Sequence, residues 1–216
     1  MIAFVVAALM GIMLIHILKE SIPALREVGI KMFLPSSEWR PVSAAPQYGL
    51  LPAVTGTLYV SGLAVLFAMI LGVACACFLT FFMPKKLASV CLAFIDLVAG
   101  IPSVIFGFIG LTVLVKAFVK YLKMAAGQCV LVAGIVLGIG RAFGETMAVI
   151  MIAGNQAWIP DNMFQGIRTL TANIVMEMGY AQDLHREALI ATGVVLFVFI
   201  LIINTLFSIL KRREAK

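Results

Sequence analysis

The stretch VLVAGIVLGIGRAFGETMAVIMIAGN, Val130–Asn155, is apolar and long enough to cross a lipid bilayer, yet Arg141 and Glu145 lie near its middle. A charged side chain at that depth costs a few kcal/mol or more, so it is rarely kept without a partner or a polar cavity. Because the two residues are four apart, they face the same side of a helix. We therefore predict that this face turns away from lipid and that the other helices pack around it.

Small residues accompany the charged pair along the same stretch. Gly134, Gly138 and Ala148 continue the stripe of Arg141 and Glu145 at steps of three and four residues. Small side chains let helix backbones approach closely inside a membrane. The predicted helix-packing residues are Gly134, Gly138, Gly140, Gly144 and Ala148.

Composition places the whole chain among polytopic helical membrane proteins. Of its 216 residues 63% are hydrophobic and 12% are charged, and runs long enough to cross a bilayer recur. Backbone groups in lipid must be paired, and the alternating pattern of barrel strands is absent, so we predict an all-α polytopic fold. We expect a single transmembrane domain over residues 1–216, with five apolar segments at about 1–18, 54–82, 87–115, 130–154 and 188–210.

The charged residues favour a membrane topology over contact with nucleic acid. The formal net charge of +6 is gathered in short clusters beside the apolar segments, which is typical of cytoplasmic flanks. The segment 21–50 is nearly neutral and the segment 156–187 is acidic, so both are expected outside the cell. Trp39 and Tyr48 in the first of these suit a membrane interface.

The segment 87–115 contains two features that disturb a simple span. Pro102 follows Gly100-Ile101 and is expected to kink or break the helix, since proline removes a backbone donor. Asp96 lies either near the cytoplasmic surface or toward a cavity within the protein, and we favour the cavity. The basic clusters can all lie on the cytoplasmic side only if this segment enters the membrane and returns to the same side, with Pro102 at its apex. A single crossing and a re-entrant hairpin both stay open.

The sequence contains no pattern of a metal site or of an enzyme. Cys75, Cys77, Cys91 and Cys129 lack CxxC spacing and neighbouring histidines, so we expect small buried hydrophobic residues and no metal. A nucleophile–base pair and an HExxH motif are also absent. We therefore predict that the chain is not an enzyme.

Six stretches, in order over nearly the whole chain, resemble the phosphate-specific ABC importer permease of the PstC type. The match of GRAFGETMAV together with RTLTANI is highly specific within ABC permeases. The six stretches are Phe33–Ser43, Gly56–Leu79, Asp96–Leu111, Gly138–Asn155, Arg168–Ala181 and His185–Asn204.

The resemblance implies a type I ABC importer permease-like helical bundle in the cell membrane of a prokaryote. Such a permease pairs with a PstA-type sister permease, and two cytoplasmic ABC ATPase subunits bind and hydrolyse the ATP, so this chain needs no cofactor of its own. A phosphate-binding protein delivers inorganic phosphate from outside. The permease forms the translocation pathway for phosphate and does no chemistry itself.

The chain departs from the family pattern in one respect. The family has six spans and a cytoplasmic loop, with an EAA motif, that docks into the ATPase. Here one span and that loop are missing, and the join falls within VLVAGIVL at 130–137. This puts docking to the ATPase in doubt. The second hypothesis is therefore an internally deleted, coupling-defective membrane protein with no transport of its own.

The predicted substrate pathway centres on Arg141. A guanidinium group matches phosphate oxygens with two hydrogen bonds, and Glu145 would hold it or moderate its affinity. The alternative is an ion pair that only orders helix packing, although Arg before Glu is the less favourable orientation within a helix. Thr146, Ser103 and Asp96 are further candidates for the pathway.

Overall fold

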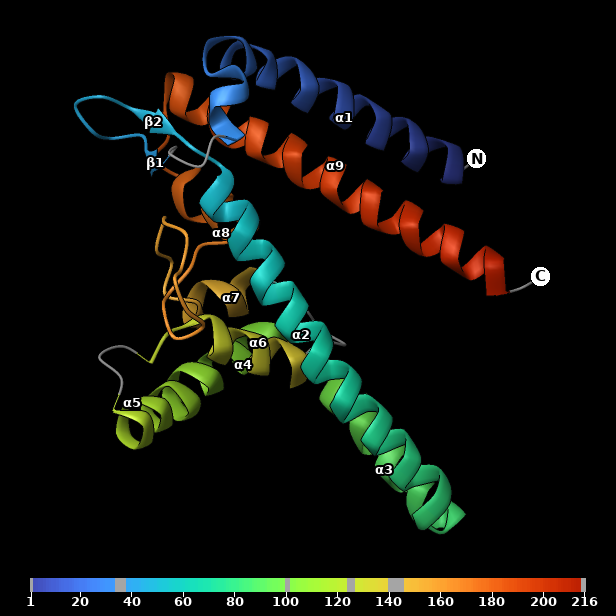
Figure 1. The fold of residues 1–216 in the computed structure, drawn as a ribbon. Coiled ribbons are helices and arrows are strands. Elements are labelled where there is room, and N and C mark those ends of the chain that lie inside the picture. The colour runs from blue at the N-terminus through green and yellow to red at the C-terminus, as the bar shows by residue number, and fades with distance from the viewer. Residues whose placement is uncertain (1, 34–37, 100–101, 124–126, 140–145, 215–216) are drawn as a thin grey trace. The chain divides into compact units, whose positions relative to one another are not determined.

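The structure, a computed structural model, describes residues 2–33, 38–99, 102–123, 127–139 and 146–214. These residues form helices and one small strand pair, which confirms the predicted all-α polytopic class (Figure 1). The chain divides into two compact units. Unit 1 is Met1–Leu51 with Asn173–Lys216, and unit 2 is Pro52–Ala172.

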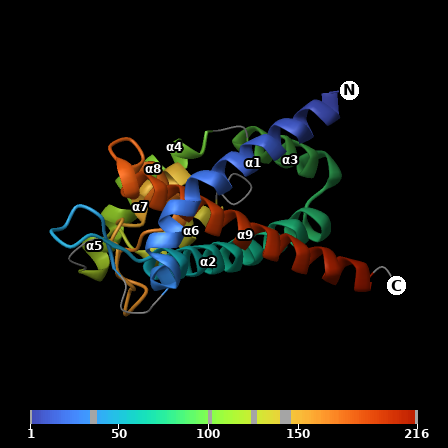
Figure 2. The same ribbon diagram turned by 90° about the horizontal axis from the view of Figure 1, so that it is seen from above.

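Unit 1 is built on two long helices, α1 (Ile2–Glu27) and α9 (Asp183–Glu214). They pack along each other, and their terminal ends diverge in Figure 2. Helix α1 continues nine residues beyond the apolar segment 1–18. The extension follows from burial, because Ser21 and Ala24 are fully enclosed and tertiary packing sustains helix where local sequence does not.

The remainder of unit 1 forms a compact cap of short elements. A 3-10 turn, η1 (Gly29–Phe33), precedes the antiparallel strands β1 (Trp39–Arg40) and β2 (Gln47–Tyr48), which place Trp39 opposite Tyr48. The amide of Leu50 donates to the carbonyl of Met32 over 2.7 Å. Helix α8 (Leu170–Glu177) begins in unit 2, and its residues from Asn173 onward belong to unit 1.

Unit 2 begins with α2 (Leu51–Cys77), which the π-helical segment η2 (Phe78–Phe82) prolongs. Helix α3 (Lys85–Ala99) follows. After Pro102 the chain is helical again through α4 (Ser103–Ile109), the π-helical η3 (Gly110–Val115) and α5 (Lys116–Leu122). Pro102 itself is extended, with φ −54° and ψ 132°, so a helix ends before the proline and another begins after it.

Four of the described helices are long and apolar enough to cross a membrane. They are Phe4–Glu27, Leu51–Phe82, Val104–Leu122 and Asp183–Leu206. Their side chains are mostly exposed, as expected for surfaces that face lipid. Cys75 and Cys77 are among the exposed residues of α2, whereas Cys129 is buried, so the expectation of buried cysteines fails at the first two positions.

The predicted single span over 130–154 is wrong, because this stretch turns back on itself. The residues of this stretch that the structure describes form two short helices, α6 (Val130–Ile139) and α7 (Thr146–Ile152). The Gln128 side-chain amide donates to the carbonyl of Met151 over 2.7 Å, whereas an unbroken helix would separate these residues by about 35 Å. The start of α6 therefore meets the end of α7, and we call this unit the α6–α7 hairpin.

The charge pattern suggested a re-entry for the segment 87–115. For 87–115 itself, a single crossing and a return both stay open.

The α6–α7 hairpin packs against two other elements of unit 2. A Cβ atom added at Gly134 would lie 2.5 Å from the Cβ of Leu63 in α2, and Gly138 is equally close to Phe67. On the other side, a Cβ at Gly107 of α4 would lie 2.8 Å from the Cα of Ala148. The core of unit 2 is apolar and consists of Val60, Cys129, Val130, Val132, Ala133, Val136, Val149, Ile152, Ala153 and Ile167.

Candidate functional site

The predicted charged centre falls outside the described residues. Arg141 and Glu145, with Gly140 and Gly144, belong to the stretch that joins α6 to α7. The backbones of Thr146 and Ser103 are described, as the first residues of α7 and α4, but their side chains are not. Asp96 is exposed on α3, so within this chain it does not face the protein cavity that we favoured.

The structure nevertheless brings several of the predicted elements together. Helices α4 and α7, which begin at Ser103 and Thr146, pack against each other, and Ala148 is only 2% exposed at their contact. Gly134 and Gly138 instead face α2. The small residues predicted to form one stripe therefore contact two different helices, because the chain reverses between Gly138 and Ala148.

Both ends of the α6–α7 hairpin are held by residues 163–170, which we call the strap. The amides of Val130 and Leu131 donate to the carbonyls of Gln165 and Met163, each over 3.1 Å. At the other end of the hairpin, the amide of Ile167 donates to the carbonyl of Ala153 over 2.7 Å. Most buried backbone groups must find such partners. The strap thus fixes the hairpin by backbone pairing.

Arg168 adds a side-chain contact to this arrangement. Its Nε donates to the carbonyl of Asn155 over 3.1 Å, just beyond the end of α7. Asn155 has a positive φ of 52°, and its Nδ2 donates to the carbonyl of Ile150 over 2.6 Å. Arg168 therefore ties the strap to the turn after α7.

The strap is also docked on the first turns of α2. The hydroxyl of Thr57 accepts a hydrogen bond from the amide of Leu170 over 3.0 Å, and Gly56 leaves room for the carbonyl of Arg168. Thr169 caps α8, since its Oγ1 accepts from the amide of Ala172 over 3.2 Å. Two stretches far apart in the sequence, which begin at Gly56 and Arg168, therefore lie side by side.

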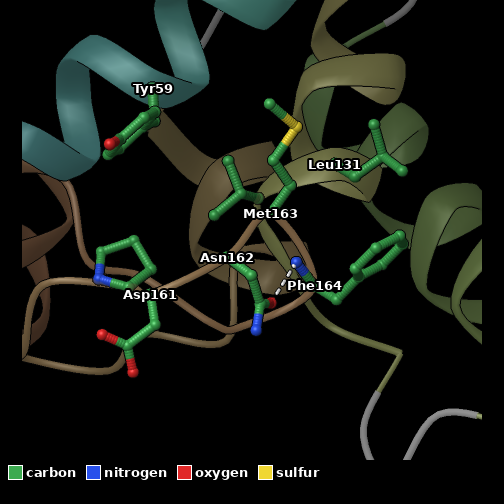
Figure 3. A pocket seen from close by; sticks show the side chains of 8 residues that line it. Tyr59, Leu131, Asp161, Asn162, Met163 and Phe164 are labelled. Carbon is green, nitrogen blue, oxygen red and sulfur yellow. Dashed lines mark hydrogen bonds between the residues drawn. The ribbon is translucent and has the colours of Figure 1, made fainter.

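A pocket opens at the beginning of the strap. It has a volume of about 410 Å³ and lies between α2, the start of α6 and residues 160–164, of which Met163 and Phe164 belong to the strap (Figure 3). The lining residues are Tyr59, Val130, Leu131, Pro160, Asp161, Asn162, Met163 and Phe164. Among the described residues, no group of three or more His, Cys, Asp or Glu side chains could hold a metal ion.

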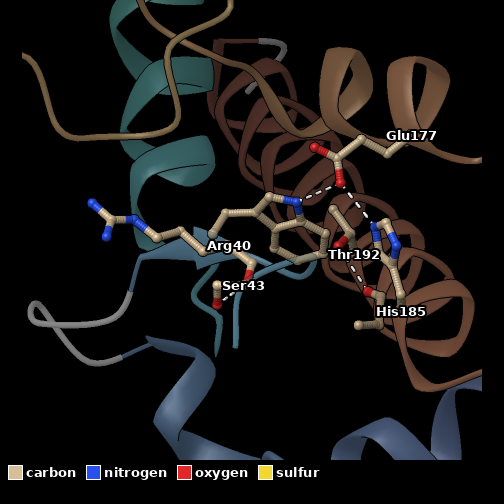
Figure 4. A network of polar contacts seen from close by, with 7 residues as sticks. Arg40, Ser43, Glu177, His185 and Thr192 are labelled. Atoms are coloured by element: carbon tan, nitrogen blue, oxygen red, sulfur yellow. Dashed lines mark hydrogen bonds and ion pairs between the residues drawn. The ribbon is translucent and has the colours of Figure 1, made fainter. Parts of the chain in front are cut away.

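Unit 1 contains a buried polar cluster that sequence reasoning missed (Figure 4). One carboxylate oxygen of Glu177, Oε2, accepts a hydrogen bond from Nε1 of Trp39 over 2.7 Å and lies 2.8 Å from Nε2 of His185. The His185 and Glu177 side chains are only 10% and 6% exposed. Because indole is a donor only, Glu177 acts as the shared acceptor that joins β1 to α8 and α9.

Aromatic rings enclose His185 in this cluster. Its ring centroid lies 6.1 Å from that of Trp39, 6.4 Å from Tyr48 and 5.9 Å from Tyr180. Burial, and secondarily the nearby charge of Glu27, raise the pKa of the Tyr48 phenol. The predicted interfacial residues Trp39 and Tyr48 are therefore internal. No local pattern signals this, since Trp39 and Glu177 are 138 residues apart.

The chain is similar to known permeases over most of its length. It is 27% identical to the phosphate transport system permease protein PstC of Mesorhizobium japonicum, an alignment that covers 93% of this chain and 84% of the relative. It is 31% identical to the probable ABC transporter permease protein YqgH of Bacillus subtilis, covering 82% of this chain and 77% of the relative. The chain belongs to the PstC-type family of ABC transporter permeases. No family model and no solved structure matches it.

The family and the four candidate spans make this permease a multi-pass protein of the cell membrane. The alignments also show that it is shorter than its relatives internally. The alignment with PstC of Haemophilus influenzae extends over 285 residues and covers 97% of this chain, but 97% of 216 residues is only about 210. About 75 positions of the aligned region, 285 less 210, therefore have no counterpart in this permease.

Proposed function

We propose that this permease is a subunit of an ATP-driven phosphate importer and forms the membrane passage for inorganic phosphate with a PstA-type sister permease. The similarity to several phosphate transport system permeases named PstC, over most of the chain, carries the proposal. An ABC ATPase on the cytoplasmic side would supply the energy, and an external phosphate-binding protein would supply the anion.

The proposed anion contact is Arg141, with Glu145 holding the guanidinium group or tuning its affinity. Both residues belong to the stretch between α6 and α7. Helix α6 is packed on α2 through Gly134 and Gly138, and α7 is packed on α4 at Ala148. The strap holds the opposite ends of these helices. A fixed hairpin of this kind supports the proposal, since a charged group inside a membrane needs a constrained surrounding.

Phosphate uptake in a bacterium that lacks its own PstC-type permease tests this function. The permease is expressed together with the sister permease, the ATPase and the phosphate-binding protein, and uptake of labelled phosphate is measured. Arg141→Ala should abolish uptake while the protein stays in the membrane. Arg186→Ala, which removes an exposed arginine of α9, is the matched control and should leave uptake unchanged. Normal uptake by Arg141→Ala would contradict the anion contact.

The second hypothesis, a coupling-defective membrane protein, is favoured by the missing alignment positions. We place the loss within 130–137, where a span and the ATPase-docking loop would otherwise stand. If this is correct, the permease will not co-purify with the ATPase and will not transport. Inserting the missing span and loop of a full-length relative at this point should then restore both. Uptake by the unmodified permease would refute this hypothesis.

A further inference from the structure

The pocket next to the strap has a polar side and an apolar side. Figure 3 shows the hydroxyl of Tyr59 and the carboxylate of Asp161 on one side of the view, with Leu131 and Phe164 on the other. The loop is preformed, because the amide of Asp161 donates to Oε1 of Gln165 over 2.8 Å. The amide of Phe164 likewise donates to Oδ1 of Asn162 over 2.9 Å. An amphipathic ligand fits such a lining.

The position of Tyr59 along α2 sets the depth of the pocket. The candidate span Leu51–Phe82 has 32 residues and is therefore about 48 Å long, whereas the hydrocarbon core of a bilayer is about 30 Å thick. A centred span thus extends by about six residues beyond the core at each end. Tyr59, eight residues after Leu51, lies just inside this boundary, where tyrosine and tryptophan are enriched.

The surface around the pocket also suits the lipid boundary. Two residues that line the pocket, Phe164 and Met163, are 51% and 49% exposed. Large apolar side chains grouped on a surface mark a site of contact with a membrane or another apolar partner. In a protein that spans the bilayer, phospholipids are present at this depth at high local concentration.

The charge of the pocket lining favours one class of lipid headgroup. Asp161 is the only charged residue among the described residues that line the pocket, and it is also the only charged residue in the sequence between 146 and 167. A carboxylate repels headgroups of net negative charge, and it accepts charge-assisted hydrogen bonds from an ammonium group. A choline headgroup carries no N–H donors and cannot make those hydrogen bonds.

We propose that this pocket binds a phospholipid with a primary ammonium headgroup, with Asp161 accepting from the ammonium and the wall of Leu131, Met163 and Phe164 taking the upper part of an acyl chain. A volume of about 410 Å³ lies within the range of small-molecule sites and accommodates part of a lipid. A lipid bound here would cover the apolar loop beside the strap.

Lipid retention by the purified full-length permease tests the proposal. Native mass spectrometry is used to titrate the detergent-solubilised protein with phosphatidylethanolamine, phosphatidylglycerol and phosphatidylcholine of the same acyl chains. Phosphatidylethanolamine should be retained best. Asp161→Asn should lower its retention relative to phosphatidylcholine by about two- to fivefold, since an exposed ionic contact is worth little. Asp183→Asn, an exposed carboxylate of unit 1, should change nothing.

A second variant fills the apolar part of the pocket. Leu131→Trp should lower retention of phosphatidylethanolamine while the far-UV circular dichroism stays that of the unmodified permease. Equal retention of the three lipids, a preference for phosphatidylglycerol, or unchanged retention in both pocket variants would overturn the proposal. If Leu131→Trp loses helical circular dichroism signal, the proposal is decided by lipid retention in Asp161→Asn compared with the unmodified permease.

Discussion

Two buried regions of this permease are held together by different kinds of contact. In unit 1, a single carboxylate oxygen of Glu177 joins β1 to α9 through Trp39 and His185. In unit 2, backbone hydrogen bonds to the strap hold the two ends of the α6–α7 hairpin, and glycines pack α6 on α2. The first region depends on side-chain chemistry, and the second depends on volume and backbone geometry.

This difference predicts which substitutions each region tolerates. Replacing the shared acceptor by an apolar residue of similar size leaves buried donors unpaired. A close contact at a glycine, in contrast, does not depend on charge, but an added methyl group disrupts it because no space is left for the extra atoms. The two regions should therefore respond to different classes of substitution, and each of the following tests compares a damaging change with a matched harmless one.

The largest effect is expected at Glu177. Glu177→Ala leaves the Trp39 and His185 donors without their shared acceptor, and breaking such a buried pair costs about 3–5 kcal/mol in the free energy of unfolding. Denaturant unfolding followed by the fluorescence of Trp39, in a Trp158→Phe background, measures the loss. Glu187→Gln is the control. A loss below about 1 kcal/mol would show that the cluster is not what holds unit 1 together.

The next effect concerns the hairpin. Gly138→Ala places a Cβ against that of Phe67, closer than such atoms pack, so it should destabilise unit 2 by about 1–3 kcal/mol. Gly72→Ala is the matched control on α2, where an added Cβ meets nothing within 4 Å. That change should be neutral or stabilise by up to about 1 kcal/mol through helix propensity. Thermal unfolding of the solubilised protein compares the stability of the two variants. Equal unfolding temperatures for Gly138→Ala and Gly72→Ala would refute close packing at Gly138.

A smaller effect tests the docking of the strap on α2. Thr57→Val keeps the shape of the side chain but removes the acceptor for the amide of Leu170, which should cost about 1 kcal/mol. Hydrogen exchange at the amide of Leu170 should accelerate in this variant. Thr57→Ser retains the hydroxyl and should keep the protection. Unchanged exchange in Thr57→Val would mean that the strap is held by its other contacts alone.

The smallest effect is a pH dependence in unit 1. The pKa of Tyr48 is raised above its ordinary value of 10.0 by burial and by Glu27, so the folded state favours the protonated phenol. Its contribution to stability is therefore complete below pH 10.0 and is lost as the pH rises through the raised pKa. Tyr48→Phe should flatten the alkaline loss of stability. The absorbance of phenolate, measured over an alkaline pH range in the unmodified permease and in Tyr48→Phe, reports the titration of Tyr48.

The sequence predicted the membrane class and the approximate positions of most helices. Apolar runs identify spans directly, and Pro102 marked the break that separates α3 from α4. It also predicted that Gly134 and Gly138 stand at a close helix contact, where the structure places them against Leu63 and Phe67. The role of Arg141 and Glu145 stays a prediction, since both lie outside the described residues.

The fold of residues 130–154 was beyond the reach of the sequence pattern. Hydropathy measures whether a segment is apolar, and a short helical hairpin inside a protein is as apolar as one long span. The contacts that decide between them are tertiary, such as Gln128 with Met151 and the strap with both helix ends. The cluster of unit 1 was missed for a similar reason, because Trp39 and His185 read separately as ordinary loop and helix residues.

The sequence by itself determined that this chain is a membrane protein and belongs to the PstC-type permeases, because the length of apolar segments and the order of motifs are properties of the linear chain. The tertiary structure alone decided which apolar stretch turns back and which carboxylate becomes a shared acceptor. Both choices depend on groups distant in sequence satisfying one another's hydrogen bonds and volumes. Local residue patterns do not predict which distant groups pair.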